Sequence, residues 1–211
     1  MLIEILGVIG IGKSTLLRAF PDEDYVKVQE PVEDNPWLAP FYAELSYLQA
    51  LRKVGNLAPA RTTPIMEVYL QARRKNEIFR GWQKDPFRPI VTDYGRPGAF
   101  ARLLHNAKII SDLDYKTFLE VQQATEFTST LRTVFYLDGI ERAFENMRKR
   151  ARPCELGVSL EYLKDLDTSY REELGKDAYY IPWGNGHSDI NQIRAILQEL
   201  HLSSVNDLIL V

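Results

Sequence analysis

Short apolar runs alternate with longer amphipathic stretches along the chain. Five of the runs predict strands, and they cover residues 2–6, 25–29, 90–93, 133–138 and 178–182. Helices are predicted over about 14–20, 35–53, 65–82, 98–106, 113–130, 140–150, 159–174 and 189–200. Because strands and helices alternate and the strands read as buried, the pattern indicates an α/β domain built on a parallel sheet.

Two of the predicted strands end in a carboxylate. Glu30 closes the second strand just before Pro31, and Asp93 closes the third. Ligands of open parallel sheets bind outside the carboxyl ends of the strands, so we expect both carboxylates to meet the loop after the first strand. Glu30 could there accept a proton during phosphoryl transfer, and Asp93 could act on Mg²⁺. The alternative is that each is only a capping or turn carboxylate.

The first strand runs into Gly-Val-Ile-Gly-Ile-Gly-Lys-Ser-Thr at residues 7–15, which is the P-loop pattern in its strand–loop–helix context. The backbone N–H groups of such a loop cradle phosphate oxygens, while Lys13 can reach the β- and γ-phosphates and Ser14 can ligate Mg²⁺. The alternative is a glycine-rich turn that matches by chance. We expect ATP to be held by Gly7, Gly10, Ile11, Gly12, Lys13, Ser14 and Thr15.

Composition narrows the class of protein. With 211 residues, of which 45% are hydrophobic, the chain fits one domain over residues 1–211. The net charge of −3 gives no sign of a nucleic-acid interface, although a local basic patch stays open. The single cysteine, Cys154, favours a reducing, cytoplasmic location, and no apolar run approaches membrane-spanning length. His105, His187 and His201 lie in polar sequence and favour the surface over a metal site.

A basic run extends through the sixth predicted helix and just past its end, and it contains Arg142, Arg148, Lys149, Arg150 and Arg152. Pro153 prevents a regular helix from continuing, so Arg150 and Arg152 should lie in or beside a loop. Arginines that close over ATP can neutralise charge on the transferred phosphoryl group and exclude water. The alternative is a solvated, charged helix face.

Together these motifs resemble the deoxynucleoside kinase family, in particular its bacterial deoxyadenosine/deoxyguanosine kinase members, over most of the chain. The most specific block is Glu-Pro-Val-Glu-Asp-Asn-Pro-Trp-Leu at residues 30–38, and the segment at 150–163 is similar to the family's lid and the helix after it. The resemblance implies a P-loop NTPase fold of three α/β/α layers, with a helical lid at about 146–157. It also implies ATP and Mg²⁺ as cofactors and a homodimer.

The resemblance assigns the acceptor side of the site to three residues. Glu30 would be the base that activates the 5′-hydroxyl of a nucleoside. Tyr42 would contact the sugar 3′-hydroxyl, and Glu155 would contact the sugar as well. These roles follow from matching motif positions, whereas the sequence pattern alone gives only a carboxylate at a strand end.

The phosphate side is assigned in the same way. Lys13, Arg150 and Arg152 would stabilise the transferring phosphoryl group, and Ser14 with Asp93 would hold Mg²⁺. Phosphoryl transfer asks mainly for positioning and charge stabilisation, which this set of side chains could supply.

The chain departs from the family's pattern at several places. The segment from Asp93 to Phe100 is shorter than in the family and displaces an arginine that contacts phosphate, for which Arg96 is the candidate replacement. An earlier lid arginine is Asn146 here, with Arg148 as a candidate substitute. Extra sequence at about 43–61 lies between the two helices that would wall the substrate site.

The departure that bears on the substrate is Glu67. The family has a glutamine at this position, and that amide reads the base edge through one donor and one acceptor. A carboxylate offers only acceptors, so Glu67 should favour an edge that presents donors, first guanine and then a uracil or thymine derivative. Arg74, on the same helix, is a further candidate for substrate binding. The alternative is that Glu67 pairs with Arg74 and touches no base.

The leading hypothesis is an ATP- and Mg²⁺-dependent kinase of a deoxynucleoside 5′-hydroxyl, with a small-molecule substrate and no membrane partner. A second hypothesis keeps the fold and makes the acceptor a nucleoside monophosphate or a modified base hydroxyl in DNA. A monophosphate would need extra cations, for which the candidates are Arg61, Arg73, Arg74 and Arg96. The overall acidity weighs against DNA, and a retained base at Glu30 weighs against a monophosphate. A third hypothesis is a nucleotide-binding subunit without catalysis.

Overall fold

The computed structural model describes residues 1–31, 35–53, 62–125, 131–184 and 190–200. Its strands form one parallel sheet in the spatial order β2-β3-β1-β4-β5. They are β1 (Leu2–Leu6), β2 (Val26–Val28), β3 (Ile90–Thr92), β4 (Arg132–Asp138) and β5 (Tyr179–Pro182). Each strand lies within its predicted run, except that β4 begins one residue earlier, so the predicted parallel sheet is confirmed.

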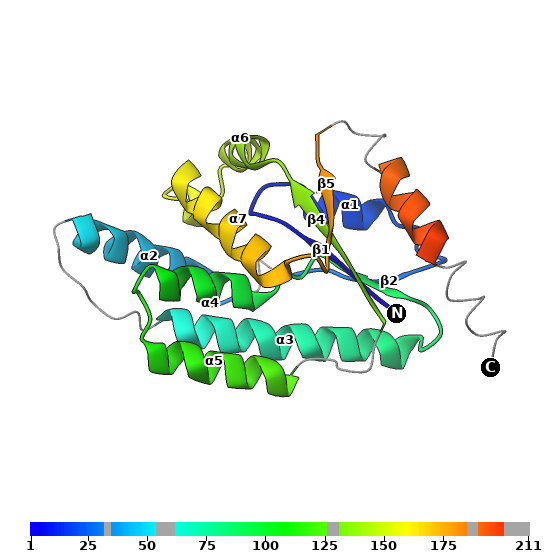
Figure 1. The fold of residues 1–211 in the computed structure, drawn as a ribbon, viewed down its shortest axis with the longest axis horizontal. Helices are drawn as coiled ribbons and strands as arrows, with labels where there is room; N and C mark the ends of the chain where they lie inside the picture. Colours follow the sequence, from blue (N-terminus) through cyan, green and yellow to red (C-terminus); the bar gives the residue numbers. More distant parts are fainter. Residues whose placement is uncertain (32–34, 54–61, 126–130, 185–189, 201–211) are drawn as a thin grey trace.

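Helices cover the sheet on both sides. They are α1 (Lys13–Ala19), α2 (Leu38–Lys53), α3 (Thr62–Lys84), α4 (Pro97–Asn106), α5 (Asp112–Thr125), α6 (Ile140–Arg150) and α7 (Leu160–Leu174), with a 3₁₀ turn η1 (Pro153–Glu155) and a helix over 190–200. In Figure 1, α1 and the helix over 190–200 lie on one side of the sheet, and α3 with α5 lies on the other. None of the helices in the described ranges is both long and apolar enough to cross a membrane.

Local hydrogen bonds explain where the helices begin. Ser159 precedes α7 and its hydroxyl accepts the N–H of Tyr162 at 3.1 Å, which confirms the predicted N-cap. α2 begins later than predicted, because the side-chain oxygen of Asn35 accepts the N–H of Trp37 at 3.0 Å and forms a turn instead. The predicted insertion at about 43–61 continues α2 to residue 53, and 54–61 lie outside the described residues. Residues 126–130 of the predicted fifth helix also lie outside them.

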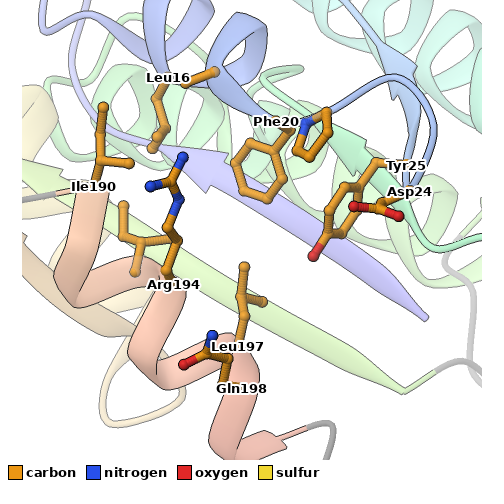
Figure 2. Close-up of a pocket in the computed structure, with 11 residues that line it drawn as sticks. Leu16, Phe20, Asp24, Tyr25, Ile190, Arg194, Leu197 and Gln198 are labelled. Carbon is orange, nitrogen blue, oxygen red and sulfur yellow. The ribbon is translucent and has the colours of Figure 1, made fainter.

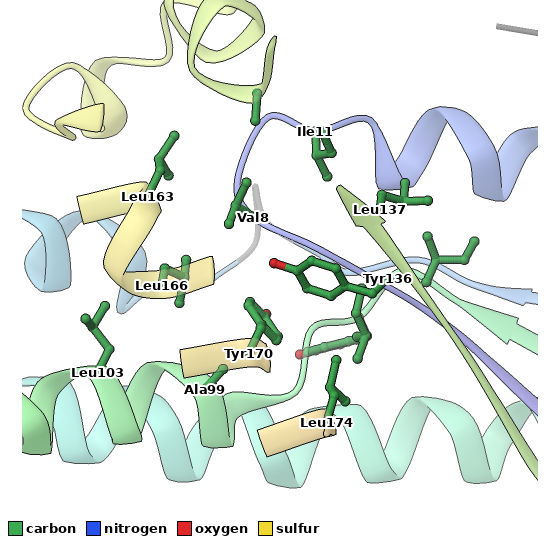
Figure 3. Packing of buried hydrophobic residues seen from close by; sticks show 14 of the residues in the cluster. Val8, Ile11, Ala99, Leu103, Tyr136, Leu137, Leu163, Leu166, Tyr170 and Leu174 are labelled. Atoms are coloured by element: carbon green, nitrogen blue, oxygen red, sulfur yellow. The ribbon is translucent and has the colours of Figure 1, made fainter. Parts of the chain in front are cut away.

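The aromatic side chains of β4 and α7 fix the helix to the carboxyl end of the sheet. The Tyr136 hydroxyl donates to Asp167 on α7 at 2.6 Å, and its ring centroid lies 5.7 Å from that of Tyr170. Figure 3 shows both rings among the apolar side chains of the core, close to Val8 and Ile11 in the loop after β1. The loop after β1 is therefore supported by the same core as the sheet.

β1 carries a charge into the middle of this core. Glu4 has no exposed surface, and its carboxylate pairs with Arg74 on α3, with Arg96 at 2.6 Å and with Arg132 at 3.1 Å. Burial raises the pKa of Glu4, but the three guanidinium groups outweigh it and lower the pKa from 4.5 to about 2. The cluster joins α3, the segment after β3 and β4 around the central strand.

Replacing Glu4 with glutamine keeps the side-chain shape and removes the charge that the arginines face. A shift from 4.5 to about 2 corresponds to about 3 kcal/mol of unfolding free energy. Because the folded pKa lies below the unfolded one, this contribution is complete above about pH 4.5 and is lost as the pH falls toward 2. Urea unfolding should therefore show Glu4→Gln about 3 kcal/mol less stable at pH 7, with the gap closing in acid. Glu120→Gln, on the exposed surface of α5, should show no such gap. A pH-independent difference would contradict this assignment of the charge.

Candidate active site

The loop between β1 and α1 depends on its glycines, as Gly10 and Gly12 show. Gly10 has a φ of +87°, and a Cβ built there would lie 2.3 Å from the carbonyl oxygen of Ala143 on α6. Gly12 has a φ of +113°, and its Cβ would lie 2.9 Å from Nε1 of Trp183. Any L side chain would be strained in this backbone region and would collide with a neighbour. Glycine thus allows the loop to pack tightly between α6 and the segment after β5.

Lys13 begins α1 and its ammonium group turns back over the loop. Nζ donates to the carbonyl oxygen of Gly7 at 2.9 Å and to that of Val8 at 3.3 Å. Burial lowers the pKa of Lys13, and Arg150 lowers it further, whereas three nearby carboxylates oppose the shift. The ammonium group therefore lies where charges of both signs meet around the loop.

Asp93 connects the ends of three strands. It follows β3, is buried, and accepts the hydroxyl of Ser14 through Oδ2 at 2.5 Å. Its Oδ1 accepts the backbone N–H of Glu30, after β2, at 2.8 Å. The convergence of Asp93, Glu30 and the loop after the first strand, predicted from strand ends alone, is thereby confirmed.

Glu30 stands at the end of β2 beside this junction. Burial, with a smaller contribution from Asp93, outweighs the opposing effect of Lys13 and Arg152 and raises the pKa of Glu30 from 4.5 to about 7. A carboxyl group with a pKa near neutrality can take up a proton and release it again at neutral pH. The position and the pKa both suit a general base.

The segment after α6 brings two arginines onto one carboxylate. Nη2 of Arg150 donates to both carboxylate oxygens of Glu155, at 2.8 and 2.6 Å, and Nη1 of Arg152 lies 3.5 Å from Oε1. Glu155 is buried in η1, whereas both guanidinium groups are partly exposed. Pro153 ends the helical path as expected, and Arg152 precedes η1 in extended conformation.

Many of these side chains line a cavity of about 860 Å³, but the predicted site residues Asp93 and Glu67 do not. The P-loop forms one wall, α2 and α3 form another, and the segment after α6 forms a third. Of the predicted site residues, those that line the cavity are Gly7, Gly10, Gly12, Lys13, Ser14, Thr15, Glu30, Tyr42, Arg150, Arg152 and Glu155. The cavity thus places a phosphate-type loop, a carboxyl base and two arginines around one volume.

Sequence comparison identifies the family. The sequence model named "Deoxynucleoside kinase" matches residues 88–199. The deoxyadenosine kinase of Dictyostelium discoideum is 30% identical over 189 residues, which cover 85% of this chain and 69% of that protein. The chain belongs to the deoxynucleoside kinase family. The deoxyadenosine/deoxycytidine kinase of Bacillus subtilis (strain 168) is 28% identical over 180 residues, covering 80% of this kinase and 74% of that protein.

The fold of this kinase also matches a solved member. The structure of deoxyadenosine kinase from M. mycoides with bound dATP superimposes with a TM-score of 0.74, at 22% identity, over 94% of this chain and 99% of the other. The predicted P-loop fold of three layers is confirmed. As a member of the family, the chain is a nucleoside-phosphorylating enzyme that binds an ATP-type nucleotide.

Several predicted contacts of the kinase lie elsewhere. Arg74 and Arg96 do not line the cavity, because the carboxylate of Glu4 engages both of them. The alternative that Glu67 pairs with Arg74 is wrong, because both carboxylate oxygens of Glu67 lack a hydrogen-bond partner among the described residues. Ile11 is buried beneath the loop, and its N–H donates to the Val8 carbonyl at 3.4 Å instead of facing the cavity.

Two side chains of α6 differ from expectation. Nδ2 of Asn146 donates to the carbonyl oxygen of Gly10 at 3.1 Å, so this residue supports the loop that phosphate would occupy. Arg148 stacks over the ring of Phe144 at 5.1 Å and donates to the Leu156 carbonyl at 3.4 Å, so it does not line the cavity. From the sequence, Asn146 could be recognised only as a position where the family has an arginine.

The aromatic lining of the cavity was not predicted. Tyr170 on α7 and Phe100 on α4 both line it, and their ring centroids lie 6.3 Å apart. Both residues belong to predicted amphipathic helices, and the sequence pattern predicts that an aromatic side chain on such a helix packs in the hydrophobic core. Only the crossing of α4 and α7 turns them toward the ligand volume.

A second cavity lies on the outer side of α1. It has a volume of about 560 Å³ and no lining residue in common with the first. Figure 2 shows Leu16, Phe20 and Tyr25 facing Ile190 and Leu197 of the helix over 190–200. Its lining is mainly apolar and contains none of the predicted catalytic side chains.

Gly10→Ala should abolish the P-loop conformation, because the new Cβ meets the Ala143 carbonyl and the φ is unfavourable. We expect the affinity for ATP, measured by isothermal titration calorimetry, to fall at least about tenfold, the loss of one net charged hydrogen bond or more. Gly175→Ala is the matched control, since Gly175 also has a positive φ, of +54°, but nothing lies within 4 Å of its added Cβ. Unchanged ATP affinity in Gly10→Ala would show that the loop adapts.

Proposed function

We propose that this kinase transfers the γ-phosphoryl group of ATP to the 5′-hydroxyl of a deoxynucleoside, with Mg²⁺. The observation that carries the proposal is the position of Glu30, a carboxyl with a pKa near 7 that lines the same cavity as the P-loop lysine. Relatives named as deoxyadenosine and deoxyadenosine/deoxycytidine kinases support the acceptor class.

In the proposed reaction Glu30 accepts the proton of the 5′-hydroxyl as that oxygen attacks the γ-phosphorus. The bond from phosphorus to the β–γ bridging oxygen breaks, and ADP leaves with the electron pair. Lys13, Arg150 and Arg152 surround the transferred group and stabilise its charge. Little covalent chemistry is required of the protein, because positioning and charge provide most of the acceleration.

Mg²⁺ fits the edge of the P-loop. Ser14 and Asp93 bring a hydroxyl and a carboxylate together there, and such hard oxygen ligands suit this ion. In the described part of the chain no three His, Cys, Asp or Glu side chains form a metal cluster, which agrees with an ion held by few protein ligands and by the phosphates. When bound, Mg²⁺ would neutralise phosphate charge.

The sugar is proposed to lie between Tyr42 and Glu155. Both residues line the cavity, and Glu155 and Glu30 each act on the Tyr42 hydroxyl, whose pKa is raised well above its usual value, mainly by burial. A phenol that remains protonated can donate to a sugar hydroxyl, and the carboxylate can accept from one. Arg150 would then contact both the phosphate and the residue that holds the sugar.

Three of the four arginines that could bind a monophosphate are engaged by other side chains. Arg74 and Arg96 are engaged by Glu4, and Nη1 of Arg73 donates to the Tyr69 hydroxyl at 2.6 Å. Arg61, the fourth candidate, lies outside the described residues. A panel of free nucleosides, monophosphates and DNA with labelled ATP separates these acceptors, and ATP binding without any product would favour a subunit without catalysis. The cytoplasmic location, the homodimer and the disfavoured DNA acceptor stay predictions.

The preference for guanine rested on Glu67 acting as a carboxylate. Its side chain is buried without the arginine that would hold it ionised. The choice of base therefore depends on whether the carboxyl group of Glu67 is protonated.

Glu30→Gln should bind both substrates and lose turnover. General bases contribute about 10²- to 10⁴-fold, so kcat should fall by at least about a hundredfold while the affinity for ATP stays within about twofold. Single-turnover assays together with calorimetry separate the two effects. Wild-type turnover in Glu30→Gln would remove Glu30 from the mechanism.

The acid limb of the kcat/KM–pH profile also tests Glu30. Only the deprotonated carboxylate can act as the base, so kcat/KM for the nucleoside should rise about tenfold per pH unit up to about pH 7, the pKa of Glu30. The residual activity of Glu30→Gln should lack this limb. A limb that persists in the variant would point to another titrating group.

A further inference from the structure

Three polar side chains near the cavity find no hydrogen-bond partner among the described residues. They are Glu67 and Gln71 on α3 and Tyr162 on α7. The atoms without a partner are both carboxylate oxygens of Glu67, the amide oxygen and nitrogen of Gln71, and the hydroxyl oxygen of Tyr162. The exposed fractions of these residues are 1%, 5% and 4%. Buried polar groups are normally hydrogen-bonded, and leaving one unpaired is costly.

Their position next to the substrate volume is set by α3. Glu67 and Gln71 are four residues apart and share one face of the helix. Met66 and Leu70, one residue before each of them, line the cavity itself. Glu67 itself is not among the lining residues, but Glu30, which does line the cavity, raises the pKa of Glu67, and Glu67 raises that of Tyr162 on α7. A nucleoside with its 5′-hydroxyl at Glu30 would extend its base toward this group.

The charges around Glu67 all oppose ionisation. Burial raises its pKa well above the usual value, and Glu173 on α7 and Glu30 after β2 raise it further. Arg96 and Arg102 lower the pKa of Glu173, but neither is among the groups that act on Glu67. Burial also raises the pKa of Tyr162 and Glu67 raises it further, so this phenol stays neutral. A carboxyl in such surroundings holds its proton.

We infer that Glu67 reads the base as a neutral carboxylic acid, with one donor and one acceptor. It then offers the same pair of groups as an amide, and the proton can sit on either oxygen. Adenine and cytosine present an amino donor beside a ring-nitrogen acceptor, and a carboxylic acid matches that edge with two parallel hydrogen bonds. An ionised carboxylate would instead face the ring nitrogen's lone pair with a second acceptor.

This inference rests on the proposed function and corrects the earlier preference for guanine. That preference assumed an acceptor-only carboxylate, which needs a base edge with two donors. With its proton, Glu67 admits adenine and cytosine, and it can still pair with the O6 and N1–H of guanine. The site is therefore predicted to take both classes of base and to reject adenine and cytosine only when Glu67 ionises.

Glu67→Gln is the deciding variant, because an amide copies the neutral acid and cannot ionise. The ratio of kcat/KM of the variant to that of wild type, on one nucleoside, cancels the titration of Glu30. At about pH 6 this ratio should lie within about threefold of one for deoxyadenosine and for deoxyguanosine alike. On deoxyadenosine it should then rise with pH as Glu67 ionises in the wild type. Glu161→Gln, an exposed change on α7, should give a flat ratio.

An ionised Glu67 gives the opposite pattern. The variant would gain about tenfold or more on deoxyadenosine and lose about tenfold or more on deoxyguanosine, already at pH 6, because a buried acceptor would no longer oppose the ring nitrogen. Either change would overturn the inference. So would a tenfold loss on both nucleosides, since it would show that an amide cannot replace the acid.

A stability measurement tests the protonation without catalysis. Because the folded pKa of Glu67 lies above its unfolded value of 4.5, the folded state holds a proton that the unfolded state has lost. The unfolding constant of the wild type, relative to Glu67→Gln, should therefore rise about tenfold per pH unit above pH 4.5. A relative constant that stays flat would overturn the inference. If no nucleoside is phosphorylated by either protein, the proposed function fails while this measurement still decides the state of Glu67.

Discussion

One buried carboxylate connects the P-loop helix to the residue that follows β2. Asp93 uses one oxygen for the hydroxyl of Ser14 and the other for the backbone of Glu30, so a single side chain ties the P-loop helix to the ends of β2 and β3. Both bonds have a charged acceptor, which makes them stronger and more directional than bonds between neutral groups. The distance between the phosphate site and the base is thereby a property of the sheet, and no flexible loop has to set it.

The sheet supplies that rigidity through its centre. β1 is buried along its whole length, and at Glu4 it carries a charge that draws Arg74, Arg96 and Arg132 inward. A buried ion cluster gains little net stability over apolar packing, but it penalises any arrangement that separates its members. Here it has a further effect on the cavity, because it keeps Arg74 and Arg96 out of the lining to which Lys13, Arg150 and Arg152 belong.

The sequence predicted the strands, the P-loop and the convergence of Glu30 with Asp93, because each depends on local pattern and on the rule that strand ends share an edge. It failed where distant segments meet. Nothing near Arg96 in the chain shows that its partner is a glutamate on β1, and nothing near Glu67 shows that its neighbours are carboxylates. Charge and protonation depend on surroundings that only the folded chain assembles.

The pairing of Arg150 and Arg152 with Glu155 has a consequence for the charge in the cavity. Two partly exposed guanidinium groups lie close together there and would repel one another. Glu155 acts as their internal counterion, so both guanidinium groups are oriented and neutralised within the chain itself. Under the proposed function, a triphosphate would have to compete with Glu155 for these arginines, instead of meeting two unpaired cations.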